Sequence, residues 1–371
     1  MVEGREIAGI FVPFAAGVAC CTLIPLHSSL YLVSALALAM IGWNIFAIVI
    51  AKKASISRFF IIFYLLGALS YFGEMTPSGR IPIKESSFRS FAEKCASSLK
   101  NAIDSVNYPS SESGPMVKAL ITGDKSFLSG NIVEAFRKSG ASHILALSGL
   151  HLGILYMMLL WGTAFLGHSP EAVLSRYILI LGLSGFFSLM TGASPSIIRA
   201  FLFIFLNETA KMTGRSKNPV IVLFAALTVQ LAINPAVIVS AGFQLSYMAM
   251  TGIYLLFPVL GKWYPNSGKN MVGFEGLVAR CNPIRKIWNV AAFSISCQIF
   301  TAPIAFYHFG TFPKYFLITN MIALPLTSVI MISSVFAIVL SNLGICPTFI
   351  ILLNDKAISL MIHCLNIISM M

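Results

Sequence analysis

The stretch SLYLVSALALAMIGWNIFAIVIA at residues 29–51 decides the class of fold. It contains no charged residue, and its length exceeds the roughly 20 residues with which an α-helix crosses a bilayer. The whole chain has the same character, because 57% of its 371 residues are hydrophobic and only 10% are charged, against about a quarter charged in a soluble domain. The sequence therefore predicts an all-α polytopic integral membrane protein and excludes a soluble enzyme and a disordered chain.

Apolar stretches of similar length recur along the chain and predict about eleven transmembrane helices. We expect them near 7–26, 29–51, 59–72, 143–166, 172–191, 196–211, 220–233, 237–260, 287–309, 315–340 and 347–368. They divide the chain into N-terminal helices in residues 1–73, an extracytoplasmic segment at 74–114, and a core of about eight helices in residues 115–371. Some of the core helices are expected to be broken or re-entrant.

Lysine and arginine gather in loops that all fall on one side of the membrane if eleven spans are counted. These residues are Lys52, Lys53, Arg58, Lys211, Arg215, Lys217, Lys262, Lys269, Arg280, Arg285 and Lys286. Cytoplasmic loops carry such an excess of positive charge, so we expect a multi-pass protein of the cell inner membrane with a cytoplasmic N-terminus. The polar stretch at 74–141 and the C-terminus are then extracytoplasmic. The same bias explains the net charge of +12, which does not by itself indicate nucleic acid.

The polar stretch contains two predicted helices. From Phe88 to Val106, apolar residues recur every three or four positions, which predicts an amphipathic helix suited to the membrane surface. Further on, Asn131 and Glu134 have the spacing of a capping box, and Glu134 and Lys138 have that of an i,i+4 ion pair. The second helix leads directly into the fourth span.

Polar residues inside the spans indicate where a functional site lies. The segment GASHILALSGLHLG at 140–153 places His143, Ser148 and His151 among apolar residues, and polar groups in lipid are costly unless they face a cavity or a partner. Ser148 and His151 are three residues apart and can touch on one helical face. Three interpretations stay open: a structural hydrogen bond, a water- or substrate-lined path, and a serine nucleophile, although no acid is in sight to orient its histidine.

Other polar residues stand beside residues that interrupt helices. In MTGASPSIIRA, at 190–200, Gly192 and Pro195 break a span, and Arg199 enters it near the outer end or extends to the interface. The remaining pairs are Ser148 beside Gly149, Gln244 with Ser246, Gln298 with Pro303, and Asn320 with Pro325. Broken helices in a membrane line cavities or are buried in protein, so this recurrence favours a hydrated interior over isolated hydrogen bonds between helices.

The sequence offers no recognisable catalytic or metal site. It contains only three aspartates, no phosphate-binding glycine loop and no H-E-x-x-H motif, and its seven cysteines include no C-x-x-C pair. We therefore expect no cofactor, no bound metal and no enzymatic activity.

The segment ALITGDKSFLSGNIVEAFRKSGASHILALSGLHLG at 119–153, with Gly123 and Asp124 in its loop, resembles the signature of the ComEC family of competence proteins. Later pieces resemble that family in the same order: GASPSIIRA at 192–200, GFQLSY at 242–247, QIFTAP at 298–303 and NMIALPL at 320–326. The resemblance covers residues 115 to 371. It implies an inner-membrane channel through which transforming single-stranded DNA is taken up during natural competence.

The resemblance also implies partners. Besides single-stranded DNA and membrane lipid, we expect a separate DNA receptor, a nuclease and a cytoplasmic ATPase, because the chain has no motor of its own, and a homo-oligomer is possible. Full-length family members carry an OB-like domain and often a metallo-β-lactamase-like domain. The segment at 74–114 is too short for an OB barrel and no H-x-H-x-D-H motif is present, so we expect a short form with the channel core alone.

Two other classes of function remain open from the residues. A secondary transporter of a small polar solute would use the same broken helices, but it would be expected to show inverted repeats, which the sequence does not display. A membrane-embedded serine hydrolase would depend on Ser148 and His151.

Overall fold

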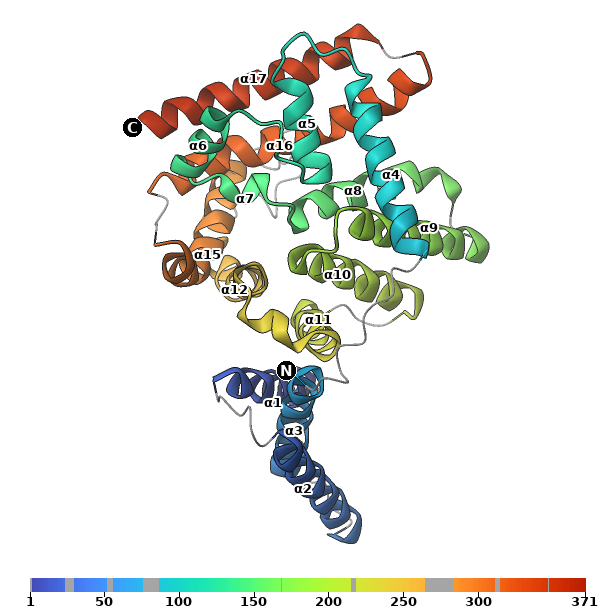
Figure 1. Ribbon diagram of the computed structural model, residues 1–371, viewed down its shortest axis with the longest axis vertical. Coiled ribbons are helices and arrows are strands. Elements are labelled where there is room, and N and C mark those ends of the chain that lie inside the picture. The colour runs from blue at the N-terminus through green and yellow to red at the C-terminus, as the bar shows by residue number, and fades with distance from the viewer. Residues whose placement is uncertain are drawn as a thin grey trace, which may run out of the picture. The chain divides into compact units, whose positions relative to one another are not determined.

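The computed structural model describes residues 2–23, 30–51, 56–75, 87–167, 169–214, 218–263, 283–310, 314–345 and 347–371. Every regular element in these ranges is a helix (Figure 1). Among the described residues, the helices long and apolar enough to cross a membrane are Gly149–Leu166, Pro170–Met190, Ala241–Leu260, Ile284–Phe309, Phe316–Asn342 and Thr348–Met370. The predicted class, an all-α polytopic membrane protein, is confirmed, while the count of eleven spans stays a prediction.

The chain forms two compact units, and each combines stretches that are distant in sequence. Unit 1 consists of Met1–Ser86 and Phe201–Tyr247, and unit 2 of Ser87–Ala200 and Met248–Met371. Their boundaries fall inside α10 (Pro195–Met212) and α12 (Ala241–Leu255), so two continuous helices belong partly to each unit.

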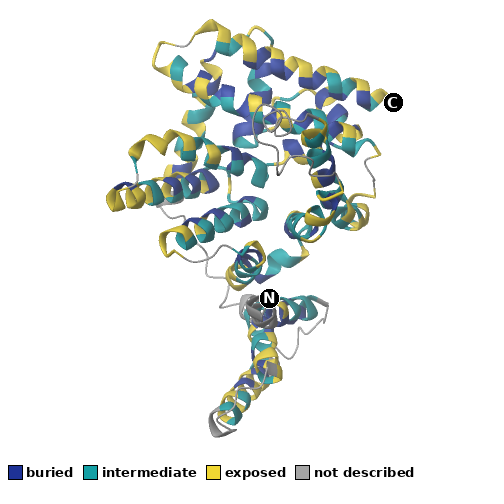
Figure 2. Ribbon diagram, turned by 180° about the vertical axis from the view of Figure 1, so that it is seen from behind, coloured by how far each residue is buried: buried dark blue, intermediate teal, exposed yellow. Residues whose placement is uncertain are grey.

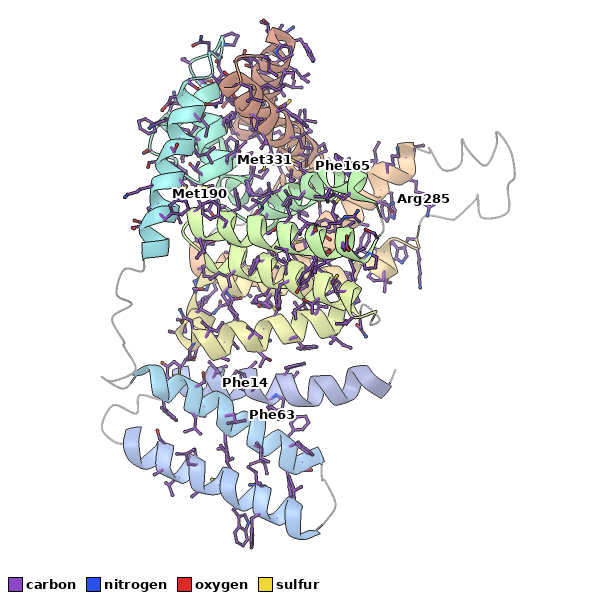
Figure 3. The ribbon with its side chains drawn as sticks, turned by 90° about the vertical axis from the view of Figure 1, so that its right-hand side faces the viewer. Phe14, Phe63, Phe165, Met190, Arg285 and Met331 are labelled. Carbon is purple, nitrogen blue, oxygen red and sulfur yellow. The ribbon has the colours of Figure 1, made fainter. Side chains whose placement is uncertain are left out.

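Unit 1 is built around a close helix crossing. It contains α1 (Val2–Leu23), α2 (Leu30–Ala51), α3 (Ile56–Met75), α11 (Pro219–Ile233) and the short η2 (Pro235–Val239). Small residues allow α1 and α3 to approach until their backbones touch. The approach is so close that a Cβ atom added to Gly17 would lie 2.0 Å from the Tyr64 carbonyl oxygen. On the other helix, a Cβ on Gly67 would lie 2.1 Å from the carbonyl oxygen of Phe14, which Figure 3 labels.

Helix α11 completes unit 1 from a later part of the chain. The Phe11 ring of α1 stacks on Phe224 of α11 with centroids 6.4 Å apart. The Ser70 hydroxyl of α3 donates to the Leu231 carbonyl at 3.4 Å. The α1–α3 pair therefore packs against a helix that begins more than a hundred residues downstream of α3.

Unit 2 contains the remaining helices. They are α4 (Ser87–Asp104), α5 (Ser113–Thr122), α6 (Gly130–Lys138), α7 (Ser142–Leu145), α8 (Gly149–Gly162), η1 (Ala164–Leu166), α9 (Pro170–Met190), the first turns of α10, the end of α12, α13 (Phe257–Leu260), α15 (Pro283–Phe309), α16 (Phe316–Asn342) and α17 (Thr348–Met370). Its largest hydrophobic core joins α4–α7 to α16 and α17, and Figure 2 shows the buried residues concentrated there. Leu120, Phe136, Ile330 and Ile358 are among its fully buried side chains.

Polar contacts reinforce this core. The Asp355 carboxylate on α17 accepts hydrogen bonds from the Ser110 N–H at 3.1 Å and the Ser113 hydroxyl at 2.6 Å, at the start of α5. The neighbouring Asn354 amide nitrogen lies 2.7 Å from the Ser333 hydroxyl on α16. Buried polar groups are tolerated when they are hydrogen-bonded, so these contacts fix α17 against both α5 and α16.

The predicted amphipathic helix is confirmed as α4. Its Ala92 and Ile103 are buried, while Phe91 is more than half exposed and its ring centroid lies 6.0 Å from that of Phe186 on α9. Figure 3 shows α4 running across the end of α9 that Met190 marks. The position of α4 on a membrane surface stays a prediction.

The capping box predicted at Asn131 is wrong. Helix α6 begins at Gly130, so Asn131 lies inside the first turn, and the N-cap residue Ser129 makes no side-chain cap hydrogen bond. Glu134 turns toward the basic end of the helix instead and pairs with Arg137 at 2.9 Å and Lys138 at 3.6 Å. The predicted Glu134–Lys138 ion pair is therefore confirmed.

Candidate functional site

The segment with the candidate polar residues contains a break between two helices. Helix α7 ends at Leu145 and α8 begins at Gly149, with extended backbone at Ala146 (φ −83°, ψ 125°) and at Ser148 (φ −130°, ψ 174°). The span expected at 143–166 is therefore divided into α7 and α8, with the break directly before Gly149, one of the helix-break candidates. Serine favours the N-cap position because its oxygen can accept a backbone N–H, and α8 starts directly after Ser148.

Ser148 and His151 do touch, through cap geometry rather than a shared helical face. The Ser148 hydroxyl oxygen accepts from the Leu150 N–H at 3.3 Å, and the Ser148 N–H donates to Nδ1 of His151 at 3.2 Å. The Ser148 oxygen also lies 3.2 Å from Nδ1. Because Nδ1 accepts a backbone proton, the neutral ring carries its own proton on Nε2.

His151 is completely buried, and its Nε2 atom has no hydrogen-bond partner. A buried polar nitrogen without a partner is rare and calls for an explanation. In the neutral ring this atom is an N–H donor, and the Ile144 backbone lies close enough to the ring to interact with it. His143, by contrast, is exposed and has its Nδ1 atom 3.1 Å from the Gly140 carbonyl oxygen.

Arg199 lies directly against the start of α8. Its side chain is buried, with 8% of its surface exposed, and a Cβ atom on Gly149 would lie 2.8 Å from its Nη2 atom. Tyr254 of α12 and Cys297 of α15 lie within electrostatic range of the guanidinium. Ser148, Gly149, His151 and Arg199, which we call the α8 cap cluster, thus lie together although two separate segments supply them.

The remaining channel-lining candidates occupy different places. The Gln244 side-chain amide in unit 1 donates to the Ile238 carbonyl at 2.9 Å. Gln298 lies half-buried on α15. Asn320 lies half-buried on α16, and its buried Oδ1 atom has no hydrogen-bond partner.

The predicted helix breaks are partly wrong. Helices α15 and α16 continue through Pro303 and Pro325. Each proline removes one backbone N–H from its helix, which bends a long packed helix without ending it. Gly192 (φ +83°) instead forms the turn between α9 and α10, and Pro195 is the first residue of α10. Gly192 and Pro195 therefore lie between two helices, in agreement with the separate spans expected at 172–191 and 196–211.

The loop with Gly123 and Asp124 is fixed at both sides. Gly123 ends α5 with φ +77°, and a Cβ atom there would lie 2.4 Å from Cδ1 of Leu147. The Asp124 carboxylate accepts from the Lys100 ammonium on α4 at 2.6 Å and from the Ser126 hydroxyl at 2.5 Å. The Lys100 bond first, and then those from Ser126, hold the pKa of Asp124 well below its usual range. This loop therefore packs against the residue that precedes the α8 cap cluster.

Some residues that make important contacts in the structure were not identified from the sequence. Asp355 had a usable signal, because an ionisable residue inside an apolar helix needs a partner. Ser113, which supplies that partner, had none, since pairing across 242 positions depends on the fold. Phe127 also gave no signal, and the structure exposes it beside Lys118.

Within the described ranges, no group of three or more histidine, cysteine, aspartate or glutamate side chains is arranged to hold a metal ion. The cysteines that the structure describes there are free thiols: Cys20, Cys21, Cys95, Cys297 and Cys364.

Comparison with known proteins connects this arrangement to a family. The family model described as "Competence protein" matches residues 120–371. The chain is 28% identical over 240 residues to ComE operon protein 3 of Bacillus subtilis (strain 168), which covers 63% of this chain and 27% of that protein. It is 26% identical over 166 residues to Competence protein ComA of Neisseria gonorrhoeae, which covers 43% of this chain and 23% of that protein.

No solved structure matches the chain. The aligned part spans about a quarter of the length of these curated relatives. The matched family region begins within α5 and contains the α8 cap cluster, the Gly123–Asp124 loop and the helices α16 and α17. By these matches, the chain belongs to the ComEC family of competence proteins.

Proposed function

We propose that this chain forms the path by which transforming single-stranded DNA crosses the cell inner membrane. Membership of the competence family supports a role in DNA uptake. The observation that carries the finer proposal is the α8 cap cluster, where the fully buried His151 presents an unpartnered Nε2 donor and the buried Arg199 packs beside it on Gly149.

The chemistry of this cluster suits a polyanion. A strand that crosses a hydrocarbon core of about 30 Å places several phosphates inside the membrane. Phosphate oxygens are acceptors only, so they need donors such as a guanidinium or an imidazole N–H. Sparse donors bind each phosphate weakly, which allows the strand to leave as well as to enter.

The same geometry speaks against the serine hydrolase alternative. Nδ1 of His151 already accepts the Ser148 N–H, and the Ser148 oxygen accepts the Leu150 N–H. The aspartates are occupied elsewhere: Asp104 with Lys118, Asp124 with Lys100, and Asp355 with Ser113. We therefore propose a channel without catalytic activity, with strand degradation and pulling performed by separate partner proteins.

The experiment that tests this proposal is uptake of labelled DNA into the cytoplasm by cells that carry His151→Leu. We expect a loss of uptake of at least tenfold while the protein still accumulates in the membrane, because leucine fills the space without a donor. His151→Gln should retain part of the activity, since its amide offers both an acceptor for the Ser148 N–H and a donor. The exposed His363 provides a matched control, and His363→Leu should leave uptake unchanged. Unchanged uptake in His151→Leu would make the cluster structural.

A further inference from the structure

The loop between α5 and α6, which Figure 1 locates, carries an exposed aromatic side chain. Phe127 has 61% of its surface exposed, although apolar residues on both sides of the loop contribute to the core of unit 2. Its neighbours Lys125, Ser126 and Ser129 are exposed and polar, and Leu128 is half-buried against the core. The loop therefore presents one ring on an otherwise polar and partly cationic surface.

The Phe127 ring is held in place by a cation. The Lys118 ammonium lies 4.6 Å from the ring centroid and is fixed by the Asp104 carboxylate at 2.7 Å. Only 10% of the Lys118 side chain is exposed, so the ion pair is an anchored feature of α4 and α5. Cation–π contact of this kind orients a ring, and more than half of the Phe127 surface stays free for another contact.

Two occupants would explain an exposed ring at such a place. A membrane anchor normally places several apolar side chains next to one another at the interface, and the polar neighbours of Phe127 do not fit that pattern. Proteins that bind single strands combine aromatic rings, on which bases stack, with cations that contact the phosphates. Phe127 with Lys125 has this composition.

We propose that Phe127 is a stacking platform for a base of the incoming DNA strand, and that Lys125 contacts a neighbouring phosphate. This inference rests on the proposed function, because it takes single-stranded DNA as the substrate. The loop is also connected to the path, since Gly123 at its start packs against Leu147, the residue before the α8 cap cluster. A strand held at Phe127 would therefore be bound by a segment in direct contact with the α7–α8 break.

The test compares binding of two fluorescent oligonucleotides of equal length to the full chain in lipid nanodiscs. One is oligothymidylate, and the other is an abasic strand with the same phosphates. Stacking of a base on one aromatic side chain typically raises the affinity about tenfold. Phe127→Leu, which keeps an apolar cover over Lys118 but has no ring, should weaken oligothymidylate binding about tenfold and leave abasic binding unchanged. Phe127→Trp should bind oligothymidylate at least as tightly as the wild type.

Control variants separate the contributions. Lys125→Gln should weaken both oligonucleotides and reduce the salt dependence of binding by about one charge. Phe165→Leu alters another highly exposed phenylalanine and should change neither affinity. Equal weakening of both oligonucleotides by Phe127→Leu, or no weakening at all, would overturn the stacking role. The fluorescence that Phe127→Trp adds to that of the four native tryptophans gives a further test: if brominated lipid but not oligothymidylate quenches this added fluorescence, the stacking role is overturned in favour of a membrane contact.

Failure of this inference can be distinguished from failure of the proposed function. If DNA uptake requires His151 but tolerates Phe127→Leu, and binding is unaffected, the channel stands and the stacking platform is wrong. If oligothymidylate binds through Phe127 while cells with His151→Leu take up DNA normally, the platform stands and the proposed path is wrong.

Discussion

Gly123 and Gly192 both have backbone conformations that L side chains rarely adopt, with φ +77° and +83°. They differ in surroundings, because a Cβ atom would meet Leu147 at 2.4 Å in the first case and open space in the second. We predict that Gly192→Ala lowers the free energy of unfolding by about 1–2 kcal/mol, the usual effect of the left-handed conformation. Gly123→Ala should lower the free energy of unfolding further than Gly192→Ala does. Thermal unfolding of both variants in detergent measures the difference between them. Equal losses would mean that the loop does not depend on its contact with Leu147.

Asp124 gives the same loop a dependence on pH. Its pKa is held below the usual range, so its stabilising effect is complete above the ordinary carboxyl value of about 4 and is lost as the pH falls through the lowered pKa. We predict that wild-type protein exceeds Asp124→Asn in stability by about 1 kcal/mol at pH 7. The difference should shrink progressively below about pH 5. Melting curves of both proteins across this pH range test it, and a difference independent of pH would contradict the role of the Lys100 bond.

Among helices, one carboxylate supplies the hydrogen bonds that connect α17 to the start of α5. Asp355→Ala removes the acceptor of the Ser110 N–H and of the Ser113 hydroxyl, which is completely buried. Leaving buried donors without a partner costs about 1–3 kcal/mol each, so we predict a loss of about 2–4 kcal/mol in stability and faster hydrogen exchange at the start of α5. Lys356→Ala, at the exposed neighbouring position, should change stability by less than about 0.5 kcal/mol. Similar values for the two variants would show that the start of α5 does not need the Asp355 carboxylate.

The sequence predicted helices well wherever a periodic pattern was long. The apolar positions between Phe88 and Val106 identified α4, and the spacing of Ser148 and His151 identified their contact. It failed at helix ends, because Ser129 and Gly130 rather than Asn131 start α6, and at Pro303, because packing keeps α15 continuous. Arg199 against Gly149 could not be predicted, since that contact depends on how helices distant in sequence pack together.

At the scale of the whole molecule, the testable property is the orientation of the chain in the membrane. We predict that residues 74–141 are extracytoplasmic, so Cys95, which is half-buried on α4, should react with a membrane-impermeant thiol reagent in intact protoplasts. A variant whose single cysteine replaces the exposed Ser97 provides a more accessible positive control on the same helix. Cys95→Ser should abolish the Cys95-dependent labelling. Labelling of Cys95 only after lysis would reverse the predicted orientation.

The division of unit 1 into two stretches of chain sets an order of events during synthesis. Ser70 and Leu231, which share a hydrogen bond, are 161 positions apart. At a translation rate of about 5–20 residues per second, the ribosome needs about 10–30 s to travel from one to the other. Until α11 emerges, α1 and α3 pack on each other, and α3 also packs on α2, among the described helices of this unit. The contact at Gly17 and Gly67 therefore has to hold the nascent helices together while more than a third of the protein is still being made.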